Sequence, residues 1–148
     1  MSKARVSSAQ RRLVIERATG CCEYCISQAR FAPQSFSVEH IRPREKGGTT
    51  TVDNLALSCQ GCNNHKYIKT EDRDVISGQT VALFHPRQQI WSDHFAWNED
   101  YTLVIGMTPT GRATVNTLKL NRIGLVNFRR VLSVMGEHPP TSSLEEMM

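Results

Sequence analysis

The first twenty residues show the polar and apolar pattern of a short helix between recognisable end signals. Ser7 and Ser8 both suit the N-cap position, because a hydroxyl oxygen accepts a hydrogen bond from the first free amides of a helix. Gly20 suits the position just after a helix end, where the backbone turns left-handed. A helix over residues 9–18 is therefore predicted.

The next fifty residues predict two short strands followed by a short helix. Apolar and polar side chains alternate over residues 35–41, and residues 54–58 form a second short apolar run, so both segments are predicted to be strands. The run 42–51 between them holds a proline and two glycines and must be a loop. Residues 63–70 are polar and suit a short helix.

The second half of the chain predicts a strand, a turn and a final helix. Residues 101–107 are a plausible strand and residues 109–111 a turn. Asn121 could cap a final helix, whose apolar face is marked by residues three and four apart. These are Leu125, Phe128, Leu132 and Met135. The aromatic residues Trp91, Phe95 and Trp97 are expected in the core rather than against nucleobases.

Length and charge narrow the class of protein only slightly. A chain of 148 residues has room for one compact domain, or a small core with an appendage. The net charge of +4 permits a polyanionic partner without requiring one. No apolar stretch is long enough to span a membrane and no signal peptide precedes the first helix, so a cytoplasmic protein is expected. The oligomeric state stays open.

The cysteines carry the first chemical signal. Four of the five fall into two C-x-x-C pairs, Cys22 with Cys25 and Cys59 with Cys62. In a reducing compartment such pairs indicate metal rather than disulfides, and four thiolates close a zinc ion to substrate, so a structural Zn²⁺ is predicted. Buried free thiols, or one redox pair, are the alternatives, and Cys21 is expected to be a bystander. Because residues 21–70 hold few large apolar side chains, the zinc should stabilise this part of the fold.

Five motifs follow one another in order between residues 22 and 70. They are C-E-Y-C at 22–25, V-E-H-I-R-P-R at 38–44, K-G-G-T-T at 46–50, D-N-L-A-L-S-C at 53–59 and Q-G-C-N-N-H-K at 60–66. This segment resembles the HNH endonucleases of the ββα-metal superfamily. The motifs L-F-H-P-R at 83–87 and T-P-T-G-R-A-T-V at 108–115 more weakly resemble an extension of some prokaryotic HNH proteins.

The resemblance implies a hairpin and a helix that clasp one catalytic Mg²⁺ or Mn²⁺. It implies that His40 is the general base, Glu39 the acidic metal ligand, and Asn54 the residue that orients the base. Asn63 takes the position of the second ligand, with His65 as the alternative. Because neighbouring side chains of a regular strand point to opposite faces, Glu39 and His40 can share one ion only where the strand ends or bends.

Basic residues surround these positions and are candidate contacts to a phosphate backbone. The nucleic-acid-binding candidates are Arg42, Arg44, Lys46, His65 and Lys66. An ordinary solvated basic loop is the alternative. Near the end of the chain, Arg129 and Arg130 are expected on a solvated helix face.

The sequence therefore predicts an α+β protein with a zinc-tethered ββα-metal core, an N-terminal helix, and a C-terminal hairpin with helices. The expected divisions are 1–20 for the helix, 21–70 for the nuclease core, 71–138 for an extension packed on it, and 139–148 for a flexible tail. The expected function is metal-dependent hydrolysis of DNA, with RNA not excluded as substrate. A zinc-stabilised nucleic-acid-binding module without cleavage is the alternative.

Overall fold

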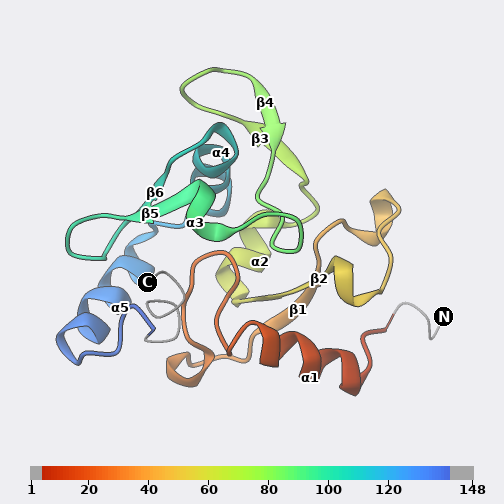
Figure 1. Cartoon of the computed structure of the whole chain (residues 1–148), viewed down its shortest axis with the longest axis horizontal. Helices are drawn as coiled ribbons and strands as arrows, with labels where there is room; N and C mark the ends of the chain where they lie inside the picture. Colours follow the sequence, from red (N-terminus) through yellow and green to blue (C-terminus); the bar gives the residue numbers. More distant parts are fainter. Residues whose placement is uncertain (1–4, 141–148) are drawn as a thin grey trace.

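The computed structural model describes residues 5–140, so the expected tail beyond residue 140 lies outside the described residues. Its elements, coloured along the chain in Figure 1, alternate between short helices and two-stranded antiparallel sheets. The helices are α1 (Ser8–Arg17), α2 (Gln60–Lys66), α3 (Trp91–His94), α4 (Pro109–Leu118) and α5 (Ile123–Val134). The strands are β1 (Ser37–His40), β2 (Leu55–Ser58), β3 (Glu71–Arg73), β4 (Thr80–Ala82), β5 (Phe95–Trp97) and β6 (Val104–Gly106).

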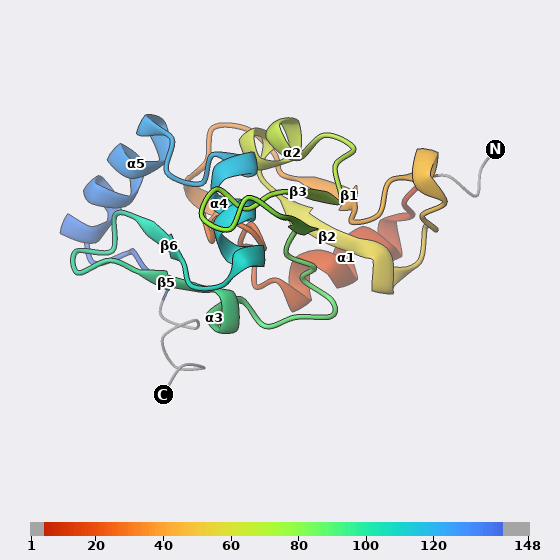
Figure 2. The same ribbon diagram turned by 90° about the horizontal axis from the view of Figure 1, so that it is seen from above.

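The predicted hairpin and its helix form the centre of the first half. Strands β1 and β2 pair antiparallel with Glu39 opposite Ala56 and His40 opposite Leu55. The hairpin lies between α1 on one side and α2 on the other (Figure 2). This ββα unit, with helices and small antiparallel sheets around it, confirms the predicted α+β class.

Helix α1 begins and ends close to the predicted residues. The Ser7 hydroxyl accepts a hydrogen bond from the Gln10 amide, and the Gln10 side chain accepts one from the Ser7 amide. These reciprocal bonds form a capping box, which satisfies two backbone donors at the start of the helix. Gly20 follows the helix with a φ of +72°, as its place in the sequence indicates.

Helix α2 begins three residues earlier than predicted. Its N-cap is Cys59, whose sulfur accepts from the amide of Cys62 at 3.5 Å. The polar pattern of the sequence places the start after the cysteine pair, because a thiol is not among the usual capping groups. The second C-x-x-C pair is therefore the first turn of the helix rather than a loop before it.

The prediction of a turn at residues 109–111 is wrong, because this segment begins helix α4. The Thr108 hydroxyl caps the helix by accepting from the Gly111 amide at 3.0 Å, and Pro109 stands at the start of the first turn. Threonine followed by proline is a helix-start signal as well as a turn signal.

Two predictions about helix α5, its N-cap and the exposure of Arg129, are wrong. Its N-cap is Arg122, and the Asn121 side chain instead bonds the backbone of Val104 in β6, accepting from the amide at 2.8 Å. Arg129 is only 2% exposed and donates to the carbonyls of Thr102 and Leu120, whereas Arg130 is exposed as expected. The helical spacing alone does not reveal these carbonyls, because they belong to the loops that precede β6 and α5.

Aromatic residues of the second half pack against the first half. Phe95 is buried and contacts the rings of Phe84 and Trp91, and Trp91 contacts Trp97. Phe95 therefore lies in the core as expected, whereas Trp91 and Trp97 are partly buried and pack against the core. The Trp91 indole donates to the Tyr24 carbonyl at 2.9 Å, and Arg87 forms an ion pair with Glu23. Within residues 5–140, no helix is both long and apolar enough to cross a membrane.

Candidate functional site

Four cysteine sulfurs meet where the turn that holds Cys22 and Cys25 contacts the start of α2. The Sγ atoms of Cys22, Cys25, Cys59 and Cys62 all lie within 4.8 Å of one another, and all four residues are buried. The first pair stands on the tight turn after α1, and the second pair forms the first turn of α2. The Sγ atoms of Cys25 and Cys59 are 3.6 Å apart.

This cluster fits a tetrahedral zinc ion. Zn–S bonds of about 2.3 Å place the sulfurs of a tetrahedral site roughly 3.8 Å apart. Hydrogen bonds from the neighbouring thiols, that of Cys22 first, hold the pKa of Cys59 well below its ordinary value, while burial raises the pKa of Cys22. Cys21 is buried outside the cluster, in agreement with its expected role as a bystander. The four cysteines therefore form a structural zinc site.

A second site lies at the loop end of the β1–β2 hairpin, where β1 ends at His40. A hollow of about 370 Å³ is bounded there by three of the predicted catalytic side chains, together with residues of the basic loop and of the end of α2. Its lining includes Glu39, His40, Asn63, Arg44 and Tyr67. Strand β1 ends at His40, so its last two side chains both border one hollow although they are neighbours in sequence.

Glu39 is the most buried of the three. Its carboxylate accepts a hydrogen bond from the Tyr24 hydroxyl, and its other oxygen lies 3.4 Å from the Lys66 ammonium. Both charged side chains are at most 5% exposed. Burial raises the pKa of Glu39, and the Lys66 charge works in the opposite direction.

His40 is half-buried and forms a hydrogen bond across the loop. Its Nε2 lies 2.8 Å from the Thr50 hydroxyl across the loop. Burial lowers the pKa of His40, and the nearby Arg44 guanidinium lowers it further, because both disfavour the charged ring. The imidazole is therefore neutral at physiological pH.

Asn54 acts on the loop that follows His40. Its side-chain oxygen accepts from the Arg42 amide at 2.9 Å, and its amide donates to the carbonyls of Arg42 and Thr49 at 3.0 and 2.8 Å. Gly48 closes the same loop, since a Cβ there would lie 1.7 Å from the Arg42 carbonyl oxygen. These three bonds join the Asn54 side chain to backbone atoms, so any orienting effect on His40 acts through the loop.

Asn63 and His65 occupy different surroundings on α2. Asn63 borders the hollow, whereas His65 is exposed and does not line it. Tyr67, which the sequence did not single out, also borders the hollow with 71% of its surface exposed. Its backbone φ of +51° is a conformation usually taken by glycine, so no sequence pattern marks this position.

The basic candidates divide between solvent and interior. Arg42, Arg44 and Lys46 are exposed on the loop between the strands and remain available to an anionic ligand. The prediction that Lys66 contacts nucleic acid is wrong, because its side chain is only 1% exposed. Its ammonium donates to the Ile41 carbonyl at 2.8 Å and faces Glu39, and these partners compensate for its burial.

Comparison with protein-family models matches residues 22–69 to the family described as HNH endonuclease. The match covers about a third of the chain and contains both sites. The match confirms the resemblance of the motifs in this segment and supports a nuclease-type function in general. Searches of curated proteins and of solved structures found no match.

The zinc site predicts that replacing one of its ligands removes both the bound zinc and the cooperative unfolding of the protein. Replacing Cys59→Ser should release zinc and abolish the cooperative thermal transition together, because structural zinc contributes about 10 kcal/mol or more in small zinc-folded units. Cys21→Ser is the matched control, since Cys21 is buried outside the cluster. Zinc content and calorimetry measure both effects. A Cys59→Ser protein that melts cooperatively without metal would contradict the site.

The buried Glu39–Lys66 pair predicts a large loss of stability when one partner is removed. Lys66→Met should lower the free energy of unfolding by about 3–5 kcal/mol, because it leaves a carboxylate buried without its cation. Lys69→Met is the control, since its side chain is 52% exposed and its pair with Asp72 should contribute about 1 kcal/mol or less. Urea unfolding compares the two, and equal losses would argue against the buried pair.

Proposed function

We propose that this protein is a metal-dependent endonuclease that hydrolyses phosphodiester bonds in DNA, with His40 as the general base. One observation carries the proposal: within the segment that matches the HNH endonucleases, Glu39, His40 and Asn63 border a single hollow. Arg44 borders the same hollow and brings a positive charge to the place where a phosphate would lie.

The state of His40 suits proton removal from water. Hydrolysis of a phosphodiester needs a base to activate water and positive charge to stabilise the transition state. The lowered pKa leaves the imidazole neutral at physiological pH. In the tautomer in which Nε2 donates to Thr50, Nδ1 keeps the lone pair that accepts the proton.

The proposed cation is Mg²⁺ or Mn²⁺. Glu39 and Asn63 would hold it, since a carboxylate and an amide offer the oxygen donors that these ions prefer. When bound, it would neutralise negative charge on the scissile phosphate. A carboxylate has lone pairs for several partners, so Glu39 can serve Tyr24, Lys66 and a cation together.

The proposed nucleic-acid contacts are the exposed cations beside the hollow. Arg42, Arg44 and Lys46 extend from the loop, and His65 is exposed on α2. Such side chains hold the phosphate backbone with little preference for sequence, and the same chemistry applies to RNA. Four cysteines in a zinc site and a fifth outside any disulfide fit the reducing cytoplasm, which is the proposed location.

A second candidate function is nucleic-acid binding without cleavage. The observation that favours it is the ion pair of Glu39 with Lys66, because an ammonium already balances the charge that a divalent cation would balance. The two functions differ in whether a divalent cation changes the DNA product.

Cleavage tests the proposal directly. Purified protein should nick plasmid DNA in the presence of Mg²⁺ or Mn²⁺. The nicking should stop when a chelator removes the cation. His40→Ala should cut about 10²- to 10⁴-fold more slowly, which is the usual effect of removing a general base. His138→Ala is the control, since His138 bonds the Tyr101 carbonyl outside the hollow.

Three outcomes separate the readings of that experiment. Cutting that survives His40→Ala would overturn the assignment of the base. Binding of DNA without cutting in either metal would favour the second candidate function. Loss of zinc or of the melting transition in His40→Ala would show that the variant reports on folding, and the comparison would then use His40→Gln.

The surroundings of His40 predict the pH dependence of cleavage. The rate should fall as the pH drops through the pKa of His40, which lies below its ordinary value of 6.5, because the protonated ring cannot accept a proton. Arg44→Gln should move this midpoint upward by removing a positive charge. Lys46→Gln, which removes an exposed cation outside the hollow, should leave the midpoint in place. Single-turnover rates against pH measure the shift, and identical midpoints would contradict it.

A further inference from the structure

The zinc site carries more charge than its own residues balance. Four thiolates around one Zn²⁺ give a net charge of −2 in a buried cluster. Buried charge is unfavourable unless nearby groups compensate for it, and metal ligands usually have hydrogen-bonding partners around them. The first half of the chain supplies neutral donors, such as the amides of Cys25 and Cys62.

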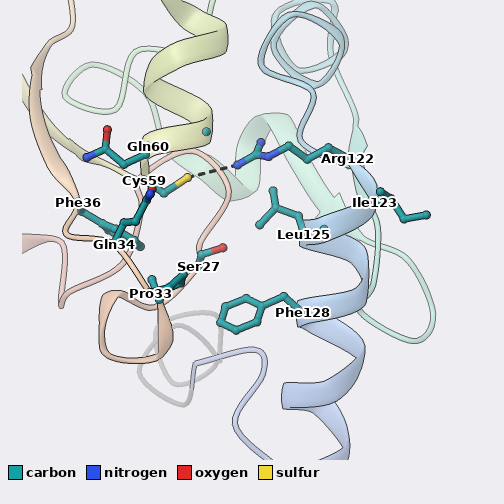
Figure 3. A pocket seen from close by; sticks show the side chains of 13 residues that line it. Ser27, Pro33, Gln34, Phe36, Cys59, Gln60, Arg122, Ile123, Leu125 and Phe128 are labelled. Atoms are coloured by element: carbon teal, nitrogen blue, oxygen red, sulfur yellow. Dashed lines mark hydrogen bonds between the residues drawn. The ribbon is translucent and has the colours of Figure 1, made fainter.

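A cation from the second half reaches the sulfurs. Arg122, which caps α5, has Nη2 3.4 Å from the Cys59 sulfur, and Nη1 3.7 Å from that of Cys62. Figure 3 shows the side chain crossing from the start of α5 to the sulfur at the start of α2. Its Nη1 also donates to the carbonyls of Leu118 and Lys119 at 3.3 and 3.1 Å, which hold the guanidinium in place.

The second cysteine pair is shaped to admit this guanidinium. Gly61 lies between Cys59 and Cys62, and a Cβ at Gly61 would stand 2.3 Å from Nη2 of Arg122 and 2.7 Å from its Cζ. A side chain at position 61 would therefore push the guanidinium away from the sulfurs. The close approach of Arg122 therefore requires glycine at position 61, whereas the C-x-x-C motif itself allows any residue there.

Arg122 also covers the side of the cluster that faces a surface hollow. Cys59 is 8% exposed, whereas the other three ligands are fully buried. It borders a hollow of about 450 Å³ between residues 27–36 and the start of α5, whose apolar wall includes Leu125 and Phe128 (Figure 3). The guanidinium lies beside the one ligand sulfur that this hollow reaches.

We propose that Arg122 is a positioning residue of the zinc site, which balances the charge of the Cys59 and Cys62 thiolates without ligating the metal. It makes zinc retention a property of both halves of the chain, because the C-terminal half delivers the cation and Gly61 admits it. This role does not depend on whether the protein cleaves nucleic acid.

Four variants of the full chain test this assignment. Arg122→Met keeps the aliphatic stem and removes the charge, and Arg122→Lys keeps a charge with fewer donors. Gly61→Ala displaces the guanidinium without changing it. Arg130→Met is the control, since Arg130 is exposed on the same helix and donates to the Asn127 side chain at 3.1 Å.

Zinc affinity, measured by competition with a chromogenic chelator, is the first readout. Arg122→Met and Gly61→Ala should bind zinc about 10- to 100-fold more weakly than the wild type, the usual effect of removing a partner of a metal ligand. Arg122→Lys should fall between them and the wild type, and Arg130→Met should match the wild type.

Cobalt substitution gives a readout that a merely structural role would not move. With the guanidinium gone, sulfur electrons are held less tightly, so the sulfur-to-cobalt charge-transfer band of Arg122→Met should shift to longer wavelength while the tetrahedral d–d bands persist. A less stable Arg122→Met with unchanged zinc affinity and band position would overturn the proposal. If Arg122→Met does not fold, the same measurements on Gly61→Ala and Arg122→Lys decide.

Discussion

The fold of the first half brings four cysteine sulfurs together in one buried zinc site. The two cysteine pairs are separated by the whole β1–β2 hairpin, yet Cys25 and Cys59 approach to 3.6 Å. Cys59 is at once a zinc ligand and the N-cap of α2, so the metal site also fixes where this helix begins. Asn63 follows one residue after the last ligand, and the zinc site therefore sets its position opposite the end of β1.

Features that depend on residues close in sequence could be predicted. The cap of α1, the two strands and the cysteine pairs all follow from spacing over a few residues. The hollow could also be anticipated, because Glu39 and His40 stand at a strand end beside a glycine-rich loop. The sequence left Asn63 and His65 as alternatives, and only the helix geometry distinguishes the residue that borders the hollow from the one that is exposed.

Features that depend on remote partners could not be predicted. Lys66 and Arg129 look like solvated cations in the sequence, yet both are buried, because carbonyl groups and a carboxylate elsewhere in the chain compensate for their charge. The start of α4 was missed for a different reason: threonine and proline signal turns as well as helix starts. No local pattern marks Arg122 as a partner of the zinc site, since the sulfurs that it contacts lie about sixty residues earlier in the chain.

Helix α2 is held at both ends by the same kind of interaction. At its first turn the thiolates face Arg122 across Gly61, and at its last turn Lys66 faces Glu39. Each pair joins the helix to a different segment, α5 in one case and β1 in the other. A buried charge tolerates little displacement from its partner, because moving away leaves it without solvent or counter-charge. With both ends fixed in this way, Asn63 in the middle of the helix has little freedom to turn away from the hollow that it shares with His40.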